Sequence, residues 1–227
     1  MSPLRGCFVT GTDTGAGKTV VAAAIAAALQ ARGERVAVWK PVVTGVDEPA
    51  GDWPHDHELL ARTVGGDPRA VTTATFGPAV SPHLAAQLAG RMLDLGVLVA
   101  AARATAAEAD VLVAEGVGGL LVPFGDFSVR DLAVALGLPL VVVARPGLGT
   151  INHSLLTIEC ARAAGLDVRA VVLTPWPEEP SVVEISNHET IAHLGEVEVA
   201  TLAPTSPAVE DLAQAGAALP LDRWLGP

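Results

Sequence analysis

Short apolar segments alternate with longer segments of helical periodicity along most of this chain. The apolar segments are continuous rather than alternating, which is typical of strands buried on both faces of a parallel sheet. We therefore predict buried strands separated by helices. The predicted strands are 6–11, 35–40, 110–119 with a glycine turn at its end, 138–147 and 167–175.

The segments between these strands have the spacing and the ends expected of helices. Ser128 is a plausible N-cap, and glycines such as Gly33 and Gly165 follow the last helical residues of two segments. The Thr- and Pro-rich stretch 67–83 is predicted to be a loop, and Pro41 is expected to end the second strand. The predicted helices are 18–31, 55–66, 84–92, 93–109, 128–139, 150–165 and one after residue 180.

Alternation of strands and helices predicts an α/β fold, a doubly wound and mainly parallel sheet flanked by helices. The chain has 227 residues and a mass of 23.1 kDa. That length is typical of one domain, so we expect residues 1–227 to form a single domain.

Charge and cysteine content narrow the class of protein. The formal net charge is -11 and no basic stripe is visible, which argues against nucleic acid or an anionic membrane as the main partner. No apolar run is long enough for a transmembrane helix, and no signal peptide is visible at the start. Cys7 and Cys160 lack CxxC spacing, so we expect core packing in a reducing cytoplasm, with a single disulfide as the alternative.

The segment GTDTGAGKT (11–19) lies between the first strand and a helix, the context of a phosphate-binding loop. N–H groups of such a loop and helix start favour anionic oxygens. Lys18 would reach the terminal phosphates, and the Thr19 hydroxyl would bind Mg²⁺. Five residues separate Gly11 from Gly17, one more than in the standard spacing, so a simple glycine turn is the alternative. The predicted nucleotide-binding residues here are Gly15, Ala16, Gly17, Lys18, Thr19 and Val20.

Lys40 stands at the end of the second predicted strand. The chain contains only two lysines, Lys18 and Lys40, and its other basic residues are arginines. Carboxyl ends of parallel strands share one crevice, so both lysines are expected to face the same polyanionic ligand. Thr44, four residues on, would add a hydroxyl group. The alternative for Lys40 is a strand-end cation whose stem extends to water.

Two carboxylates are placed to complete a magnesium site. Glu115 ends an apolar strand, and Asp56 opens the helix after the second strand. Mg²⁺ prefers one or two carboxylates together with phosphate oxygens and water. Thr19, Asp56 and Glu115 are therefore the predicted metal ligands, although Asp56 could simply be a favourable carboxylate at a helix start. His55 and His57 flank Asp56, but residues two apart do not share a helix face, so zinc is not expected.

The segment GLGTINHS (147–154) begins another helix. The free N–H groups of Gly149, Thr150, Ile151 and Asn152 could bind a carboxylate. The alternative is an ordinary capped helix start.

These motifs together resemble one known family. GTDTGAGKT, KPVVTG (40–45), SPH (81–83), EGVGG (115–119) and LGTINHSLLT (148–157) follow one another in this order. In combination they look like the dethiobiotin synthetases, which have a P-loop NTPase-like fold. The phosphate loop alone is generic to a large class, whereas its combination with KPVVTG and LGTINH is specific.

The resemblance implies a reaction in biotin biosynthesis. CO₂ or bicarbonate and 7,8-diaminononanoate (diaminopelargonate, DAPA) would give dethiobiotin, with ATP as the second substrate and Mg²⁺ as the cofactor. A carbamate forms on one amine, ATP converts it into a carbamic–phosphoric anhydride, and the second amine closes the ring. The family is homodimeric, with each active site completed by the other subunit.

The resemblance also implies a role for each matching residue. Lys18 and Lys40 would be catalytic, and Thr14 and Thr44 would contact the diamine or carbamate. The substrate carboxylate would be bound across the dimer interface by Gly149, Thr150, Ile151 and Asn152. Nucleotide contacts would come from the phosphate loop and from Asp56, Glu115, Gly116, Val117, Gly118, Thr174, Pro175 and Pro204.

Two positions depart from the family pattern. Gly15 stands where some members carry an acidic residue. Thr174 stands where the family often has an asparagine that reads the adenine ring, and threonine cannot make that bidentate contact. We therefore expect weak discrimination between nucleotide bases.

Other functions fit a phosphate loop as well. A partner-regulated ATPase of the partitioning type is the main alternative, although its second lysine in the loop is absent here, where Thr12, Asp13 and Thr14 stand. An amide-forming ligase of the cobyrinate type would need a glutaminase domain, for which this length leaves no room. A pure nucleotide-binding module would not explain Lys40, Thr44 and Glu115 together.

Overall fold

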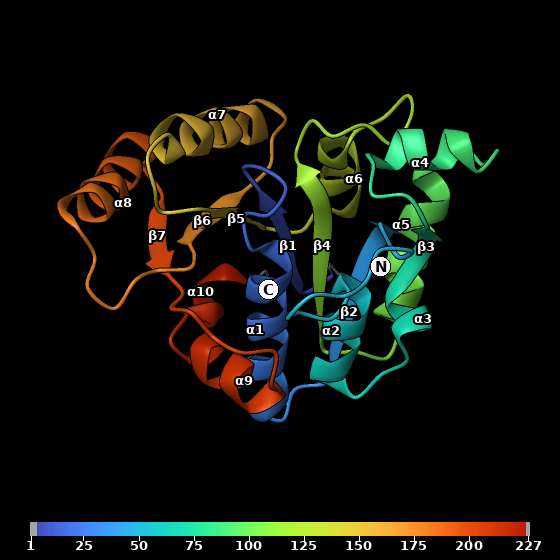
Figure 1. Cartoon of the computed structure of the whole chain (residues 1–227), viewed down its shortest axis with the longest axis horizontal. Coiled ribbons are helices and arrows are strands. Elements are labelled where there is room, and N and C mark those ends of the chain that lie inside the picture. The colour runs from blue at the N-terminus through green and yellow to red at the C-terminus, as the bar shows by residue number, and fades with distance from the viewer. Residues whose placement is uncertain (1–3, 226–227) are drawn as a thin grey trace.

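A single parallel sheet forms the centre of the molecule (Figure 1). The structure, a computed structural model, describes residues 4–225. All registered strand pairs are parallel, and the strand order is β3-β2-β4-β1-β5-β6-β7, which confirms the predicted fold class. The strands are β1 (Gly6–Gly11), β2 (Val36–Thr44), β3 (Thr72–Phe76), β4 (Val111–Gly119), β5 (Leu140–Ala144), β6 (Val168–Leu173) and β7 (Glu198–Thr201).

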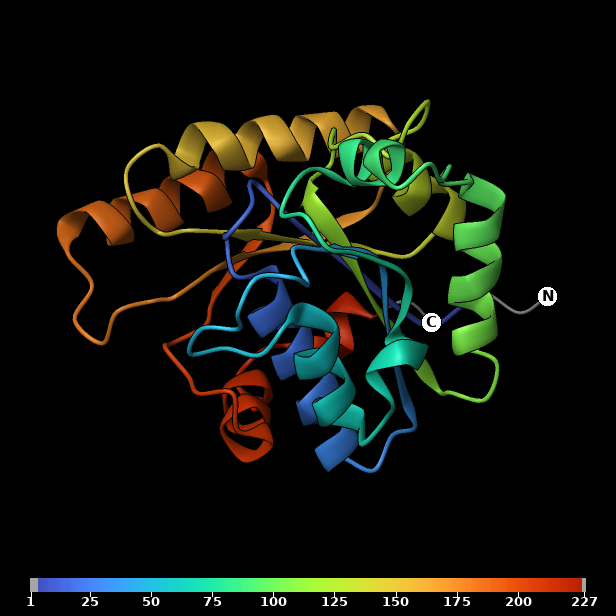
Figure 2. The same ribbon diagram turned by 45° about the vertical axis from the view of Figure 1, so that its right-hand side comes forward.

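Helices cover both faces of this sheet, as Figures 1 and 2 show. Ser128 is an N-cap as predicted, since its hydroxyl accepts a hydrogen bond from the Asp131 N–H. One face is covered by α4 (Pro82–Leu88), α5 (Leu95–Thr105), α6 (Val129–Leu136), α7 (Thr150–Ala163) and α8 (Val182–Gly195). The other is covered by α1 (Lys18–Ala31), α2 (Asp56–Val64), α3 (Pro68–Val71), α9 (Val209–Ala217) and α10 (Leu221–Trp224).

Two hydrophobic cores, one on each face of the sheet, explain the continuous apolar strands. Successive residues of a strand point to opposite faces. In β1, Phe8 belongs to one core, whereas Cys7 and Val9 belong to the other. Cys7 and Cys160 are both free thiols, and burial raises the pKa of the Cys7 thiol to about 12. The prediction of core packing for Cys7 is therefore confirmed.

The prediction that Pro41 ends the second strand is wrong, because β2 continues to Thr44. Its register with β4 stops at Trp39, and from Lys40 onward it pairs with β3 instead. Where a strand pairs on one side only, the missing N–H of a proline is tolerated.

The segment 67–83 is not the loop that was predicted. It contains α3 and the edge strand β3, in which Thr72 and Thr73 are partly buried and Thr75 is exposed. An edge strand with one neighbour and polar side chains lacks the apolar run that marks the central strands.

Glycines at the end of β4 were predicted to form a turn, but they belong to the strand. A Cβ atom on Gly116 would lie 2.9 Å from Val129 Cγ1 and 3.0 Å from Phe8 Cε1. Gly119 pairs with Gly11, and its Cβ would lie 3.3 Å from the Gly11 carbonyl oxygen. Close packing therefore leaves little room for a side chain at these two positions.

The tail beyond α8 adds β7, α9 and α10, and α9 packs directly on α1. A Cβ atom on Gly216 in α9 would lie 2.0 Å from the Ala24 carbonyl oxygen. We expect Gly216→Val to lower the free energy of unfolding by about 3 kcal/mol, because this backbone contact cannot relax around a side chain. Urea unfolding measures the change. The control Ala217→Val, at the adjacent exposed position, should cost about 0.5 kcal/mol, and equal effects of the two variants would contradict this packing.

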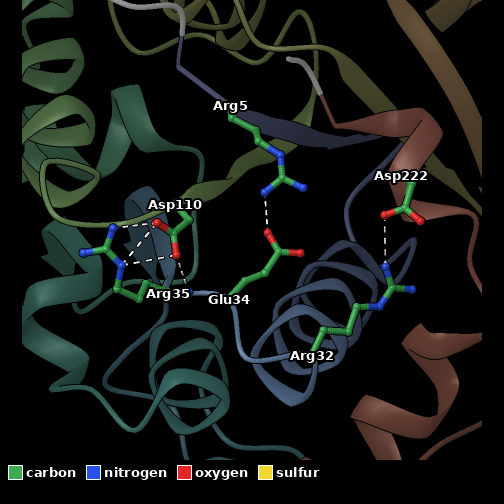
Figure 3. A network of polar contacts seen from close by, with 6 residues as sticks. All are labelled: Arg5, Arg32, Glu34, Arg35, Asp110 and Asp222. Carbon is green, nitrogen blue, oxygen red and sulfur yellow. Dashed lines mark hydrogen bonds and ion pairs between the residues drawn. The ribbon is translucent and has the colours of Figure 1, made fainter.

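Ion pairs join the amino ends of several strands (Figure 3). Arg5 before β1 pairs with Glu34, and Arg35 before β2 pairs with Asp110 at 2.5 Å. The Arg35 guanidinium lowers the pKa of the Asp110 carboxyl group to about 2. A hollow of about 900 Å³ lies at this edge, and the predicted site residues are not among those that line it.

No helix within residues 4–225 combines the length and the apolar character needed to cross a membrane.

Candidate active site

The phosphate loop follows β1 at the carboxyl edge of the sheet. β1 lies between β4 and β5, where the strand order reverses, and ligands of doubly wound folds bind in the crevice at such a point. Gly17 has φ 95° and precedes the first residue of α1. A Cβ atom there would lie 2.7 Å from the Thr174 methyl group, so both backbone conformation and space require glycine.

A cavity of about 630 Å³ opens beside this loop. Its walls come from the phosphate loop, the carboxyl ends of β2 and β4, the start of α2 and the segment before α4. The predicted site residues that line it are Thr14, Gly15, Gly17, Lys18, Thr19, Val20, Lys40, Thr44, Asp56, Glu115, Val117 and Gly118.

Lys40 lies at the centre of an ionic cluster in which Glu115 is buried and the Asp56 side chain is 45% exposed. The Lys40 side chain is 4% exposed, and its Nζ lies 2.6 Å from Asp56 Oδ2 and 2.5 Å from Glu115 Oε1. The Thr19 hydroxyl donates a hydrogen bond of 2.9 Å to the same Glu115 oxygen. The lysine therefore does not extend to water, and four residues from four different elements meet at one point.

Charges within the cluster depend on one another. Burial disfavours the Lys40 ammonium ion, but Asp56 and Glu115 together outweigh it and raise the pKa of Lys40. Burial likewise opposes ionisation of Asp56, yet Lys40 holds the pKa of that carboxyl group below its usual value. For Glu115, burial dominates and raises the pKa. Lys40 is thus the cation that both carboxylates contact directly.

The cluster has the donor set for a hard divalent cation. Two carboxylates and a hydroxyl group converge, and oxygen atoms of these kinds are the ligands that Mg²⁺ prefers. Glu115 Oε2 is buried without a hydrogen-bond partner in the structure, so one of its oxygens is available to a ligand. This cluster has two carboxylates. Within the described part of the chain, there is no group of three or more His, Cys, Asp or Glu side chains that could hold a metal ion.

Lys18 also lines the cavity. Its Nζ donates a 2.8 Å hydrogen bond to the Asp13 carbonyl oxygen, across the phosphate loop. Burial lowers the pKa of Lys18 to about 8, against the opposing attraction of Glu115. An anionic ligand in the loop would favour the charged form.

Several residues that line the cavity were not predicted as site residues. They are Val42, Trp53, Pro54, Leu59, Ala79, Val80, Ser81, Pro82 and Val122. The segment around residue 80 docks on the end of β2, where the Gly45 N–H donates to the Pro78 carbonyl oxygen at 3.1 Å. The SPH motif was the available signal, since it belongs to the family pattern, but its stretch was interpreted as loop.

Other predicted residues do not line this cavity. Ala16 and Gly116 are buried behind its walls, and Thr174 packs against Gly17 from the end of β6. Pro175 follows Thr174 through a cis peptide bond, and Pro204 is exposed after β7. The start of α7 supplies Gly149, Thr150, Ile151 and Asn152, of which Thr150 has a buried hydroxyl group without a partner.

The fold and the phosphate loop place this chain in a broad class of nucleotide-binding proteins. Residues 5–211 match the family model described as an AAA domain. Chloroplast FtsY from Physcomitrella patens has a similar structure, with a TM-score of 0.51 and 14% identity over 95% of this chain and 66% of that chain. FtsY from Elizabethkingia anophelis gives the same TM-score at 13% identity. These likenesses concern the fold alone.

Curated relatives are much more similar. The ATP-dependent dethiobiotin synthetase BioD of Anaeromyxobacter dehalogenans (strain 2CP-C) is 44% identical, covering 93% of this chain and 95% of that protein. The protein of the same name from Rhodococcus erythropolis is 40% identical, covering 91% of this chain and 92% of that protein. This chain therefore belongs to the dethiobiotin synthetase family.

Proposed function

We propose that this protein is an ATP-dependent dethiobiotin synthetase, a ligase of biotin biosynthesis. It would carboxylate DAPA with CO₂, consume ATP and close the ureido ring. The observation that supports this most directly is the burial of Lys40 against Asp56 and Glu115 beside a phosphate loop. A nucleotide-binding module needs no second lysine there, whereas a reaction between a carbamate and a γ-phosphate does.

Thr19, Asp56 and Glu115 would hold Mg²⁺, which supplies charge neutralisation of the phosphate oxygens when it is bound. The phosphate loop, with Gly15, Gly17 and the start of α1, would bind the triphosphate through its N–H groups. Asp56 and Glu115, which contact Lys40 in the structure, would be the carboxylate ligands of the cation. The Lys40 ammonium group would lie next to them and stabilise charge on the reacting oxygens.

Lys18 and Lys40 would act by positioning and by charge. Both side chains line the same cavity, so both ammonium groups would be near the oxygens of a carbamate and of a γ-phosphate bound there. Thr14 and Thr44 line the same cavity and would orient the diamine. A covalent intermediate with the protein is not required, because the anhydride forms between the two substrates.

The substrate carboxylate would be bound by a second copy of the chain. We propose a homodimer in which Gly149 to Asn152 at the start of α7 face the partner's cavity, since they do not line their own. Leu148, next to this segment, is 98% exposed, which fits a contact surface. We also propose that residues 1–227 act as a single domain in the cytoplasm.

The test is release of phosphate from MgATP with and without DAPA and bicarbonate. We expect phosphate release to depend strongly on the diamine. Phosphate release that does not depend on the diamine but rises with DNA or a protein partner would instead favour an ATPase of the partitioning type.

The preference for one nucleotide base over another tests the effect of Thr174, which stands where the family often has an asparagine. The Thr174 side chain packs against Gly17 and lacks the amide that would read adenine. We expect the kcat/KM values for ATP, CTP and GTP to lie within about 100-fold of one another, since no paired polar contact rejects the wrong base. A larger preference for ATP would contradict this prediction. The variant Thr174→Asn should raise the ratio in favour of ATP.

A further inference from the structure

Ser81 and His83 form a hydrogen-bonded pair at the edge of the candidate active site. Ser81 Oγ lies 3.0 Å from His83 Nδ1. Ser81 is the N-cap residue of α4, yet its side chain makes no capping hydrogen bond to the helix backbone. The hydroxyl group of an N-cap serine ordinarily accepts such a bond. Here it is paired with an imidazole instead.

The pair reaches from the cavity to the solvent. Ser81 is half-buried and lines the cavity together with Val42 and Thr44, whereas His83 is exposed. Docking of the preceding segment fixes this placement, since a Cβ atom on Gly45 would already lie 3.2 Å from Ala79 Cβ. A proton taken up inside the cavity at Ser81 would therefore have a route to water through His83.

The proposed reaction needs such a route. An amine that attacks a carbonyl carbon must lose a proton as the C–N bond forms. The titratable residues that line the cavity are Lys18, Lys40, Asp56 and Glu115. Lys40 pairs with Asp56 and Glu115, and Lys18 donates to the Asp13 carbonyl oxygen in the phosphate loop, so each of the four already has a partner. Ser81 with His83 lies outside this group and can accept a proton.

We propose that Ser81 and His83 form a proton relay for ring closure, an inference that rests on the proposed function. The free amine of the substrate attacks the carbonyl carbon of the carbamic–phosphoric anhydride and forms the second C–N bond. The C–O bond to the phosphate breaks, and phosphate leaves with the electron pair. The amine proton passes to Ser81 Oγ while the Ser81 proton passes to His83 Nδ1. The imidazolium ion then releases its Nε2 proton to water.

The test measures dethiobiotin formation in a single turnover, which reports the chemical steps rather than product release. We expect Ser81→Ala and His83→Ala each to lower this rate constant by about 100-fold, the range of a lost general base. Because His83 acts through Ser81, added imidazole should restore the rate of His83→Ala several-fold and leave Ser81→Ala unchanged. Both variants should keep the wild-type Tm to within a few degrees, because His83 is exposed and Ser81 makes no capping bond.

His193→Ala on α8 is the matched control, an exposed histidine that is not among the residues lining the cavity. It should leave the rate unchanged with or without imidazole. Wild-type rates in His83→Ala would overturn the relay, as would a loss that imidazole does not restore. If the wild-type protein itself makes no dethiobiotin, the proposed function fails, and this outcome is distinct from failure of the relay alone.

Discussion

Lys40→Met is expected to lower kcat for dethiobiotin formation by about 10²–10³-fold. A preorganised charged donor in a site shielded from water contributes this much when charge develops on a reacting oxygen. Lys40 is such a donor, since its side chain is 4% exposed and is held by Asp56 and Glu115. Quenched-flow measurement of product at saturating ATP and DAPA gives the rate.

The same variant should also reveal the metal site. Loss of the ammonium group removes the cation that both Asp56 and Glu115 contact, so without metal the Tm should fall by about 5–10 °C. Mg²⁺ should then raise the Tm of the variant more than that of the wild type, because nothing competes with the cation. Arg35→Met, which removes a cation at the opposite edge of the sheet, is the control and should keep kcat. Near-normal turnover in Lys40→Met would contradict the role given to Lys40.

Glu115→Gln is expected to lower kcat/KM by about 100-fold or more. A bound divalent cation contributes several kcal/mol of charge stabilisation to phosphoryl transfer, and each 1.36 kcal/mol is a factor of ten. Glu115 is fully buried, and its Oε2 has no hydrogen-bond partner in the structure, so this oxygen is free to serve as a ligand. Activity should partly return at high Mg²⁺ concentration, because the loss is one of metal affinity.

Asp110→Asn provides the matched control for a lost carboxylate, since Asp110 pairs with Arg35 away from the cavity. It should leave the Mg²⁺ concentration for half-maximal activity unchanged. An identical Mg²⁺ dependence in Glu115→Gln and the wild type would mean that Glu115 is no metal ligand.

Local patterns in the sequence predicted the central part of the fold. The strands β1, β4, β5 and β6 are continuous apolar runs because both faces of the sheet are covered. The carboxyl ends of such strands meet at one edge, which is why Lys40 and Glu115 could be placed together from sequence alone. The structure then adds that Lys40 contacts both carboxylates, a detail that no spacing encodes.

The features of the fold and the site that the sequence did not predict depend on contacts between different segments of the chain. β3 is an edge strand of threonines whose pairing with β2 shows no apolar signature. A side chain at position 116 would meet Phe8 and Val129, and one at position 119 would lie close to Gly11, and these contacts between different elements are not visible in the local sequence. Ser81 and Trp53 reach the cavity from loops, and the position of a loop is set by what it docks against rather than by its own periodicity.

The most direct test of the account is the fate of labelled carbon. The purified protein is given [¹³C]bicarbonate, DAPA and MgATP, and dethiobiotin and phosphate are quantified by mass spectrometry and colorimetry. We expect dethiobiotin to carry the label at one carbon, with one phosphate released per ring formed. Phosphate release without labelled dethiobiotin would contradict it, because the phosphate loop would then serve a different reaction.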